Sequence, residues 1–264
     1  MTEEIRLDQL LVSRGLVSGR DRAKELIAQG LVLANGRPAG KPSEKYCADV
    51  PLEILNDAAH YVSRGAHKLE GALKQYQISL SGRTVLDIGA STGGFTQCAL
   101  EHGASHVYAV DVGSGQLAEM LRKDNRVTNL EKTDVRQLLP EQLPVLPDFF
   151  ACDVSFISLR LVLPAAQRLL SPEGEGVVLI KPQFEAGRAD VGRGGIVKNP
   201  KVHLRVLREM VENFHLNGFL VAGMTVSPIR GGDGNLEFLA WVKRSGPESL
   251  PDLECLVKQA QLQK

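Results

Sequence analysis

The stretch TVLDIGASTGGFTQCAL, residues 84–100, decides the fold of this chain. Its first residues are β-prone or apolar apart from Asp87, which is the pattern of a buried strand. Gly89, Gly93 and Gly94 then break this pattern, and the apolar residues that follow have helical spacing. A strand, a glycine turn and a helix open a nucleotide-binding βαβ unit, in which glycines let the backbone approach a ligand. The stretch therefore predicts a Rossmann-like α/β domain.

Acidic residues in and after this stretch indicate what the turn binds. Asp87 stands two residues before the first glycine, where a carboxylate would repel a diphosphate and favour a cationic ligand such as S-adenosylmethionine. Asp111 ends a second apolar stretch, HVYAVD, and is placed to accept hydrogen bonds from ribose hydroxyls. Asp134 follows the apolar residues 127–130 and is a candidate for contact with the adenine amino group. We favour a methyl-donor site over an ordinary strand–helix turn or an NAD site.

Composition excludes several classes of protein. The 264 residues suffice for one large domain and one small domain, and 43% of them are hydrophobic. The net charge is +0, so any nucleic-acid surface must be a local patch. The N-terminal sequence MTEEIRLDQL lacks an apolar signal core, and no run approaches the roughly 20 apolar residues that a membrane span needs.

The cysteines lie far apart and form no C-x-x-C pair: Cys47, Cys98, Cys152 and Cys255. This spacing argues against a zinc site, an iron–sulfur cluster and a disulfide framework. It fits a reducing compartment, so we expect a cytoplasmic protein that needs no metal. We interpret Cys152 as a small core residue within a strand.

Residues 5–56 have the pattern of a separate small module. Two short helical patterns precede short strand patterns, with Asn35 and Gly36 as a hairpin turn. Basic residues concentrate on the second helix and the hairpin, which fits either an RNA-binding surface or a solvated helix face. We expect a small α+β domain, a linker, a large α/β domain and a tail or helix, at 1–60, 61–65, 66–246 and 247–264.

The small module resembles a known RNA-binding domain. Residues 7–36, LDQLLVSRGLVSGRDRAKELIAQGLVLANG, are similar to the S-four domain first seen in small-subunit ribosomal protein four, and depart from it at Gly19. They share the opening R-L-D-x-L-L, the motif R-x-x-A and the strand turn G-x-V-x-x-N-G. The resemblance implies that the second helix and the adjacent loop contact RNA phosphates. The candidate RNA-binding residues are basic side chains of this module, the linker and a later loop: Arg14, Arg20, Arg22, Lys24, Arg37, Lys41, Arg64, Arg188, Arg193 and Lys198.

Beyond the linker, strand and helix patterns alternate, as a parallel sheet requires. Apart from the stretch quoted first, expected strands cover 106–111, 127–130, 149–155, 175–182, 219–226 and 237–242. One expected helix ends at Tyr76, and further expected helices cover 115–122, 159–170, 202–214 and 245–264. The stretch GRADVGRGGIVKNP, residues 187–200, follows a strand end, where ligands bind in open α/β sheets. We expect it to be a mobile substrate lid, with a plain surface loop as the alternative.

Charged residues close several of these strands or lie on the first helix of the large domain: Lys68, Asp153, Lys181 and Glu237. Such a residue costs desolvation free energy unless it is paired or used. Their order, one per element, resembles the tetrad of ribose 2′-O-methyltransferases related to the heat-shock methyltransferase FtsJ. With the S-four module and the motifs GASTGGFT, CDVSFISL and KPQFEAG, the whole chain is similar to the TlyA family of ribosomal RNA methyltransferases, also called hemolysin A.

This resemblance implies a seven-stranded domain that transfers methyl from S-adenosylmethionine to a ribose 2′-hydroxyl and releases S-adenosylhomocysteine. The implied substrate is cytidine in ribosomal RNA or in assembled ribosomal subunits. Lys181 is implied as the base, with Asp153 and Glu237 orienting the lysines and the ribose. Repulsion from Lys68 favours the neutral amine of Lys181 and the carboxylates oppose this, so the sequence leaves the balance open. The implied donor-binding residues are Asp87, Gly89, Ala90, Ser91, Gly93, Gly94, Phe95, Asp111, Asp134 and Asp153.

Other functions fit the sequence less well. An exocyclic-amine methyltransferase would carry an Asn/Asp-Pro-Pro-Tyr/Phe motif where this chain has CDVSF. A membrane-active hemolysin would need a span, a signal or a strongly amphipathic basic helix. A non-catalytic ribosome-assembly factor would not need the four charged residues.

Overall fold

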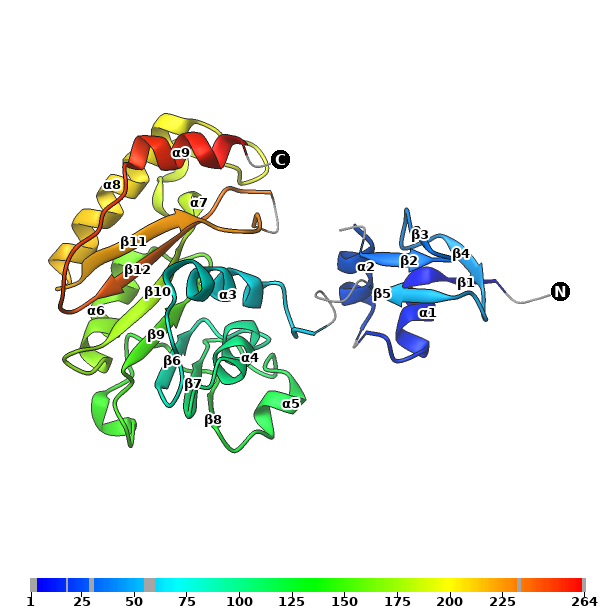
Figure 1. The fold of residues 1–264 in the computed structure, drawn as a ribbon, viewed down its shortest axis with the longest axis horizontal. Coiled ribbons are helices and arrows are strands. Elements are labelled where there is room, and N and C mark those ends of the chain that lie inside the picture. Colours follow the sequence, from blue (N-terminus) through cyan, green and yellow to red (C-terminus); the bar gives the residue numbers. More distant parts are fainter. Residues whose placement is uncertain (1–3, 18, 29–30, 55–59, 232–233, 263–264) are drawn as a thin grey trace. The chain divides into compact units, whose positions relative to one another are not determined.

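The computed structural model describes residues 4–17, 19–28, 31–54, 60–231 and 234–262. The chain divides into an N-terminal unit, residues 1–62, and a C-terminal unit, residues 63–264. Figure 1 labels the helices and strands of both units.

The N-terminal unit is a small α+β domain. Its elements are β1 (Glu4–Arg6), α1 (Leu7–Ser13), α2 (Arg20–Ala28), β2 (Val32–Ala34), β3 (Arg37–Pro38), β4 (Lys45–Cys47) and β5 (Leu52–Ile54). Strand β1 pairs with β4, and β2 lies between β3 and β5, all antiparallel. Asn35 and Gly36 have φ of 53° and 72°, which confirms the predicted tight turn between β2 and β3. Apolar residues of both helices form the core, among them Leu7, Leu10, Leu11 and Leu26.

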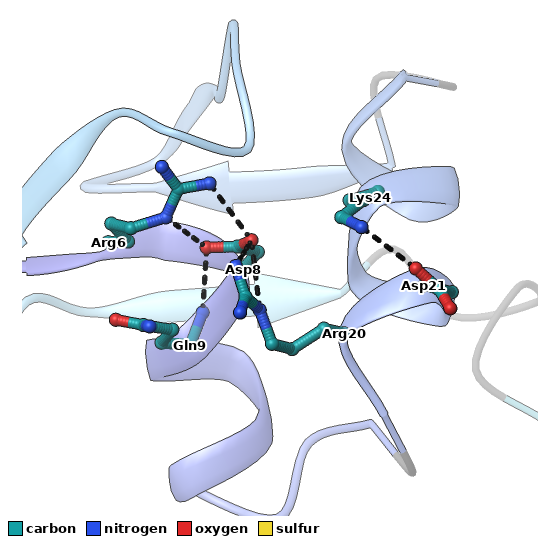
Figure 2. A network of polar contacts seen from close by, with 6 residues as sticks. All are labelled: Arg6, Asp8, Gln9, Arg20, Asp21 and Lys24. Atoms are coloured by element: carbon teal, nitrogen blue, oxygen red, sulfur yellow. Dashed lines mark hydrogen bonds and ion pairs between the residues drawn. The ribbon is translucent and has the colours of Figure 1, made fainter.

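A buried carboxylate joins the elements of this unit (Figure 2). The Asp8 side chain has 0% exposed surface and lies 3.0 Å from Arg6 Nε and 2.8 Å from Arg20 Nη2. Hydrogen bonds from Arg6, and then from Arg20, lower the pKa of Asp8 to about 2. Folding therefore holds both guanidinium groups against the start of α1.

The C-terminal unit has a central sheet with helices on both faces (Figure 1). Its first elements are α3 (Gly65–Tyr76), β6 (Thr84–Ile88), α4 (Gly94–Glu101), β7 (His106–Val110), α5 (Glu119–Arg122), β8 (Val127–Leu130), η1 (Pro140–Gln142) and β9 (Phe149–Cys152). The later ones are α6 (Leu159–Leu169), β10 (Glu175–Ile180), α7 (Pro182–Glu185), η2 (Arg188–Asp190), α8 (Pro200–Leu216), β11 (Leu220–Val226), β12 (Phe238–Lys243) and α9 (Leu253–Leu262).

The strands form one seven-stranded sheet in the order β11-β12-β10-β9-β6-β7-β8. Strand β12 is antiparallel to both of its neighbours, and the pairs from β10 through β8 are parallel. The chain order reverses between β6 and β9, which is the switch point where open α/β sheets bind ligands at their carboxyl edge. The sheet confirms the predicted seven-stranded α/β fold.

Alternation along the strands separates the two faces of the sheet. Leu86 and Ile88 of β6 lie in the core formed with α6, α8 and α9. Asp87 between them faces the other side, where Thr96 of α4 donates a hydrogen bond to it. Ser158 and Asn199 accept hydrogen bonds from backbone amides at the starts of α6 and α8, which fixes where these helices begin.

Several elements are shorter than the sequence predicts. Helix α5 spans only 119–122, because Glu131 accepts hydrogen bonds from the amides of Gln116 and Leu117 and holds them outside a helix. Strand β9 ends at Cys152 rather than at residue 155, and the terminal helix is confined to 253–262.

The stretch 187–200, predicted as a mobile lid, has specific contacts. Asn235, only 1% exposed, accepts a hydrogen bond from the Val197 amide and donates one to the Gly195 carbonyl. Arg205 pairs with Asp190 at 2.6 Å. These bonds tie the stretch to the turn before β12 and to α8, and its role as a lid stays a prediction.

We expect Asp8→Asn to destabilise the N-terminal unit by about 1–2 kcal/mol at pH 7, because the arginine-paired carboxylate is lost. The folded pKa lies below the unfolded value. The stabilisation is therefore complete above about pH 4 and disappears as the pH falls towards 2. Hydrogen exchange of the α1 amides between pH 3 and 7 measures the effect. The exposed Asp49→Asn is the control, and a pH-independent difference from wild type contradicts the assignment.

Candidate active site

The strand register brings the predicted site residues to one edge of the sheet. Ile88 pairs with Cys152, and Ile180 pairs with Phe238. All four belong to the core that includes α6 and α8. Because strand side chains alternate, the residue beside each of them faces the side of α3 and α4. These residues are Asp87, Asp153, Lys181 and Glu237.

Lys68 and Glu237 form a buried ion pair. Lys68 Nζ lies 2.6 Å from Glu237 Oε2, and the side chains are 9% and 2% exposed. The pair joins α3 to the start of β12, 169 residues apart in the sequence. Gly231 makes room for the carboxylate, since a β-carbon there would lie 2.5 Å from Glu237 Oε1. Removing one partner of a buried pair costs about 3–5 kcal/mol, so each residue depends on the other.

Lys181 forms a second ion pair on the neighbouring strand end. Its Nζ lies 2.7 Å from Asp153 Oδ1 and donates a hydrogen bond to Ser155 Oγ at 2.8 Å. The ring centroid of Phe184 lies 5.8 Å from the same nitrogen. Each lysine of the predicted tetrad therefore has its own carboxylate, which offsets the repulsion between the lysines that we considered from the sequence.

Asp87 is a buried carboxyl group with one free oxygen. It is 1% exposed, its Oδ2 accepts a hydrogen bond from Thr96 Oγ1 at 2.6 Å, and its Oδ1 has no hydrogen-bond partner among the described residues. Burial raises the pKa of Asp87 to about 7, and the charges of Asp153 and Asp111 add to this shift. A cationic group at Oδ1 would stabilise the ionised form.

The structure shows a packing reason for two glycines of the turn. Gly89 and Gly93 have φ of 85° and 98°. A β-carbon on Gly89 would lie 2.3 Å from the carbonyl oxygen of Asp153, and one on Gly93 would lie 2.2 Å from Leu121 Cδ1. These glycines let the turn pack against protein atoms. Close approach of the turn to a ligand stays a prediction.

The other acidic residues at this edge have protein partners. Asp111 accepts hydrogen bonds from the amides of Ser91 at 2.8 Å and Gly113 at 2.7 Å. Asp134 pairs with Arg136 at 2.6 Å, and the hydrogen bonds from Arg136 lower its pKa. Their contacts with ribose and adenine stay predictions.

The sequence analysis missed two polar residues near this edge of the sheet. Glu131 directly follows β8 and organises the segment before α5, and Ser155 contacts Lys181. The position of Glu131 at a strand end is the signal that could have revealed it. Ser155 carries no such signal, because its contact with Lys181 crosses from the β9–α6 loop to the end of β10.

The residues at this edge fit S-adenosylmethionine. Asp87 Oδ1 is a buried acceptor that lacks a partner within the described ranges, as a site for an ammonium or sulfonium group requires. Val112, next to Asp111, is 75% exposed and offers an apolar surface to a nucleobase. Ala90 and Phe95 are buried, at 7% and 4% exposure, and support the turn from within. In the part of the chain that the structure describes, no group of three or more His, Cys, Asp or Glu side chains is arranged to hold a metal ion.

Cys152 is confirmed as a core residue. Its side chain is 0% exposed, and burial raises the pKa of its thiol. A neutral, buried thiol is a poor nucleophile, so this cysteine does not fit a ring-carbon methyltransferase.

Two of the predicted RNA-binding arginines hold the N-terminal unit together. Arg14 donates hydrogen bonds to the carbonyl oxygens of Val50, at 2.6 Å, and Ala48. Arg20 binds the buried Asp8. Part of the donor capacity of both side chains is therefore used inside the protein.

The remaining predicted RNA-binding residues differ in exposure. Lys24 is exposed and pairs with Asp21 at 2.8 Å. Arg22 and Arg64 are half-buried. The exposed positions are Arg37, Lys41, Arg188, Arg193 and Lys198. Exposure is what a phosphate contact requires, and RNA binding by these residues stays a prediction.

We expect Asp87→Asn to weaken donor binding roughly 10- to 100-fold, because a charged acceptor is lost. The folded pKa of about 7 exceeds the unfolded value, so ionisation of Asp87 lowers the stability of the free chain as the pH rises from about 4 to 7. The variant lacks this decline and should be more stable above pH 7, by up to about 4 kcal/mol.

Calorimetric titration with S-adenosylmethionine and urea unfolding at pH 5 and 8 measure both effects. Methylthioadenosine, which lacks the charged part of the donor, is the matched ligand, and its affinity should be unchanged. Equal losses for the two ligands would place Asp87 in the support of the turn instead.

Known families match both units of the chain. The FtsJ-like methyltransferase family matches residues 61–244, and the S4 domain matches residues 5–49. YqxC of Bacillus subtilis, which carries an rRNA methyltransferase name, is 47% identical over 256 residues, which are 95% of this chain and 91% of that protein. The 16S/23S rRNA (cytidine-2′-O)-methyltransferase TlyA of Mycobacterium tuberculosis is 43% identical over 251 residues, 95% of this chain and 94% of that protein.

A solved structure is similar over nearly the whole chain. A hemolysin-named protein from Streptococcus thermophilus aligns with a TM-score of 0.78 and 41% identity, over 99% of this chain and 97% of that one. None of the helices within the described residues combines the length and hydropathy that a membrane crossing requires. The order of the two matched domains agrees with the two units of the fold. The similarity extends along nearly the whole chain and includes the strand ends that carry the charged residues. The chain belongs to the FtsJ-like methyltransferase family, in the group of S4-domain proteins that includes TlyA.

Proposed function

We propose that this chain transfers the methyl group of S-adenosylmethionine to a ribose 2′-hydroxyl of ribosomal RNA. The observation that carries the proposal is the pair of ion contacts, Lys68–Glu237 and Lys181–Asp153, at the sheet edge that also holds Asp87. Membership of the family and the rRNA methyltransferase names of its relatives support it.

The chemistry requires little from the protein beyond position and one proton acceptor. The bound donor supplies an activated methyl group, so the protein must align the ribose and deprotonate its 2′-oxygen. We assign the proton acceptance to Lys181 Nζ, which lies at the strand edge with a hydroxyl and a carboxylate around it. Asp153 orients this nitrogen, and the Lys68–Glu237 pair forms the opposite wall of the site.

A cavity between the chain segments that follow Ser155 and Lys181 suits a nucleotide substrate. It has a volume of about 470 Å³, within the range of small-molecule sites, and its lining includes Phe156, Gln183, Phe184 and Arg188. Phe156 is 92% exposed, and its ring centroid lies 5.2 Å from that of Phe184. Exposed aromatic rings beside a cationic side chain suit single-stranded, unstacked RNA.

We propose cytidine within assembled ribosomal subunits as the target. The name of the Mycobacterium tuberculosis relative gives cytidine in both 16S and 23S RNA. The S4 domain would supply sequence-independent affinity through phosphate contacts, which suits a large folded RNA. An enzyme with this substrate acts where ribosomes are assembled, so we also propose a cytoplasmic location.

Transfer of label from the donor to each purified ribosomal subunit tests this function. Resistance of one nucleotide to alkaline cleavage in the labelled RNA would identify ribose 2′-O-methylation. Label in a base would keep the methyltransferase and overturn the proposed acceptor. Binding of donor and RNA without transfer would favour a non-catalytic role in ribosome assembly.

We expect Lys181→Ala to lower the rate of methyl transfer by roughly 10²–10⁴, because the proton acceptor is lost. Donor affinity should stay within about twofold of wild type, since the donor site is built on β6 and its turn. Single-turnover kinetics and calorimetry measure the two quantities. Lys258→Ala, at an exposed position of α9, is the control. A near-normal rate of methyl transfer by Lys181→Ala would contradict the assignment of Lys181 as the base.

We expect Lys41→Ala to weaken RNA binding at all sequences alike, because an exposed lysine contacts phosphate rather than bases. The slope of log affinity against log salt should fall by about 0.7–0.9 for each lost contact. Filter binding to a subunit RNA fragment between 50 and 200 mM salt, roughly the range over which such contacts are screened, measures the slope. Lys258→Ala should leave it unchanged, and an unchanged slope for Lys41→Ala would remove this residue from the interface.

A further inference from the structure

The environment of Lys181 Nζ contains a side chain that the tetrad does not include. Ser155 Oγ accepts a hydrogen bond from this nitrogen at 2.8 Å, a distance similar to the 2.7 Å that separates the nitrogen from Asp153 Oδ1. Lys181 itself is 9% exposed, whereas Ser155 is exposed. The hydroxyl therefore lies between a nearly buried amine and the side from which a substrate must arrive.

The loop between β9 and α6 fixes where this hydroxyl lies. Phe156 has a φ of 63°, an uncommon left-handed conformation for a bulky residue, and turns the chain directly after Ser155. Ser158 and the Leu159 amide donate hydrogen bonds to Glu185 of α7 at 2.6 and 2.8 Å. Because α7 begins directly after Lys181, these bonds hold the serine loop and the lysine in register with each other.

The contacts of Nζ restrict where a neutral amine can point its lone pair. Such an amine has two N–H bonds and one lone pair in a tetrahedral arrangement. Ser155 Oγ accepts one N–H bond, and the negative charge of Asp153 Oδ1, 2.7 Å away without hydrogen-bond geometry, disfavours the lone pair on its side, so the lone pair has one remaining direction. With Asp153 alone, the amine could rotate about its bond to Cε and point the lone pair elsewhere.

We propose that Ser155 is a positioning residue for the methyl-transfer reaction, which aims the lone pair of Lys181 at the 2′-hydroxyl of the substrate. This inference rests on the proposed function and extends it by one residue. Ser155 does not itself take the proton in this proposal.

The proton balance of the step is simple. The 2′-hydroxyl proton moves to Lys181 Nζ as the methyl group from the donor takes its place on the oxygen. The lysine is then an ammonium, and it returns its proton to water before the next turnover. The Ser155 oxygen binds an ammonium more strongly than a neutral amine, because charge-assisted hydrogen bonds are the stronger ones. Loss of this oxygen should therefore favour the neutral amine while releasing its orientation.

These two consequences oppose each other and can be measured separately. In Ser155→Ala, we expect kcat at high pH to fall roughly 10- to 100-fold, as for one lost hydrogen bond to the charge that develops on Nζ in the transition state. The acid limb of the kcat profile should move to lower pH. Donor affinity and the midpoint of thermal unfolding should not change, because the serine is exposed. A merely structural role would lower kcat without moving the acid limb.

The other titratable groups near Lys181 stay unchanged in this comparison. They are Asp153, the Lys68–Glu237 pair of α3 and β12, Asp87 of β6 and Glu185 of α7. Ser155→Thr keeps a hydroxyl and should restore most of the rate. Ser81→Ala removes an exposed hydroxyl just before β6, at the opposite end of the sheet, and is the matched control.

A second readout does not require methyl transfer to RNA. Reductive methylation of the folded full chain with formaldehyde and cyanoborohydride, followed by mass spectrometry, reports how fast the neutral amine of Lys181 reacts at each pH. Ser155→Ala should raise this rate at neutral pH several-fold, whereas Ser155→Thr and Ser81→Ala should match wild type. If the wild-type chain labels no RNA, the proposed function fails, and this reactivity still decides whether Ser155 controls the lysine.

The proposal is overturned if Ser155→Ala shows the kcat, the pH profile and the Lys181 reactivity of wild type. It is also overturned if Ser155→Thr is as slow as Ser155→Ala, because the volume of the side chain would then matter rather than its hydroxyl. If Ser155→Ala lost donor binding as well as methyl transfer, the proposal would also be rejected, because the variant would then have a disturbed fold.

Discussion

The buried ion pair between Lys68 and Glu237 constrains the whole C-terminal unit. Two charges removed from water are tolerated only when they meet with good geometry, and here they meet at 2.6 Å. One charge comes from α3, before the sheet begins, and the other from the start of the last strand. Because β12 runs antiparallel, its first residues reach the edge where β9 and β10 end. The pair therefore joins the first helix of the domain to its last strand, beside the strand end that carries Lys181.

The two ion pairs of the site differ in their surroundings, and this difference suits different tasks. Lys68 and Glu237 are both nearly inaccessible, so their geometry is rigid. Lys181 has beside it the exposed Ser155 hydroxyl and the ring of Phe184, which lines a cavity. Asp87 adds a carboxyl group whose ionisation is disfavoured by burial in the free chain. The ionised Asp87 lowers the stability of the free chain, and a bound cation would remove this cost. Functional sites commonly lower the stability of the free protein in this way.

The N-terminal unit uses its basic residues in two ways. Arg14 and Arg20 bond to carbonyl oxygens and to the buried Asp8, so they contribute to folding as well as to the charge of the surface. Arg37 and Lys41 are exposed, and within the described ranges no ion pair occupies them. The proposed RNA binding is compatible with a net charge of +0, because it requires only a local group of accessible cationic side chains.

Local sequence patterns predicted the fold class, which the sheet confirms, and the strand ends at which charged side chains gather. The run from Thr84 to Leu100 predicts its strand, turn and helix from local periodicity, and the Asn35–Gly36 turn follows from backbone preferences alone. Charged residues that close apolar strand patterns, such as Asp153 and Lys181, were also predicted as site residues from the sequence. Other features appear only in the folded chain. They are the pairing of each lysine with its carboxylate and the contact of Ser155 with Lys181. They also include the packing of Gly89 and Gly93 against protein atoms and the short α5 beside Glu131. The physical reason is that periodicity and turn preferences act over a few residues. Contacts such as that between Lys68 and Glu237, by contrast, depend on the register of strands and on helices brought together from distant parts of the chain.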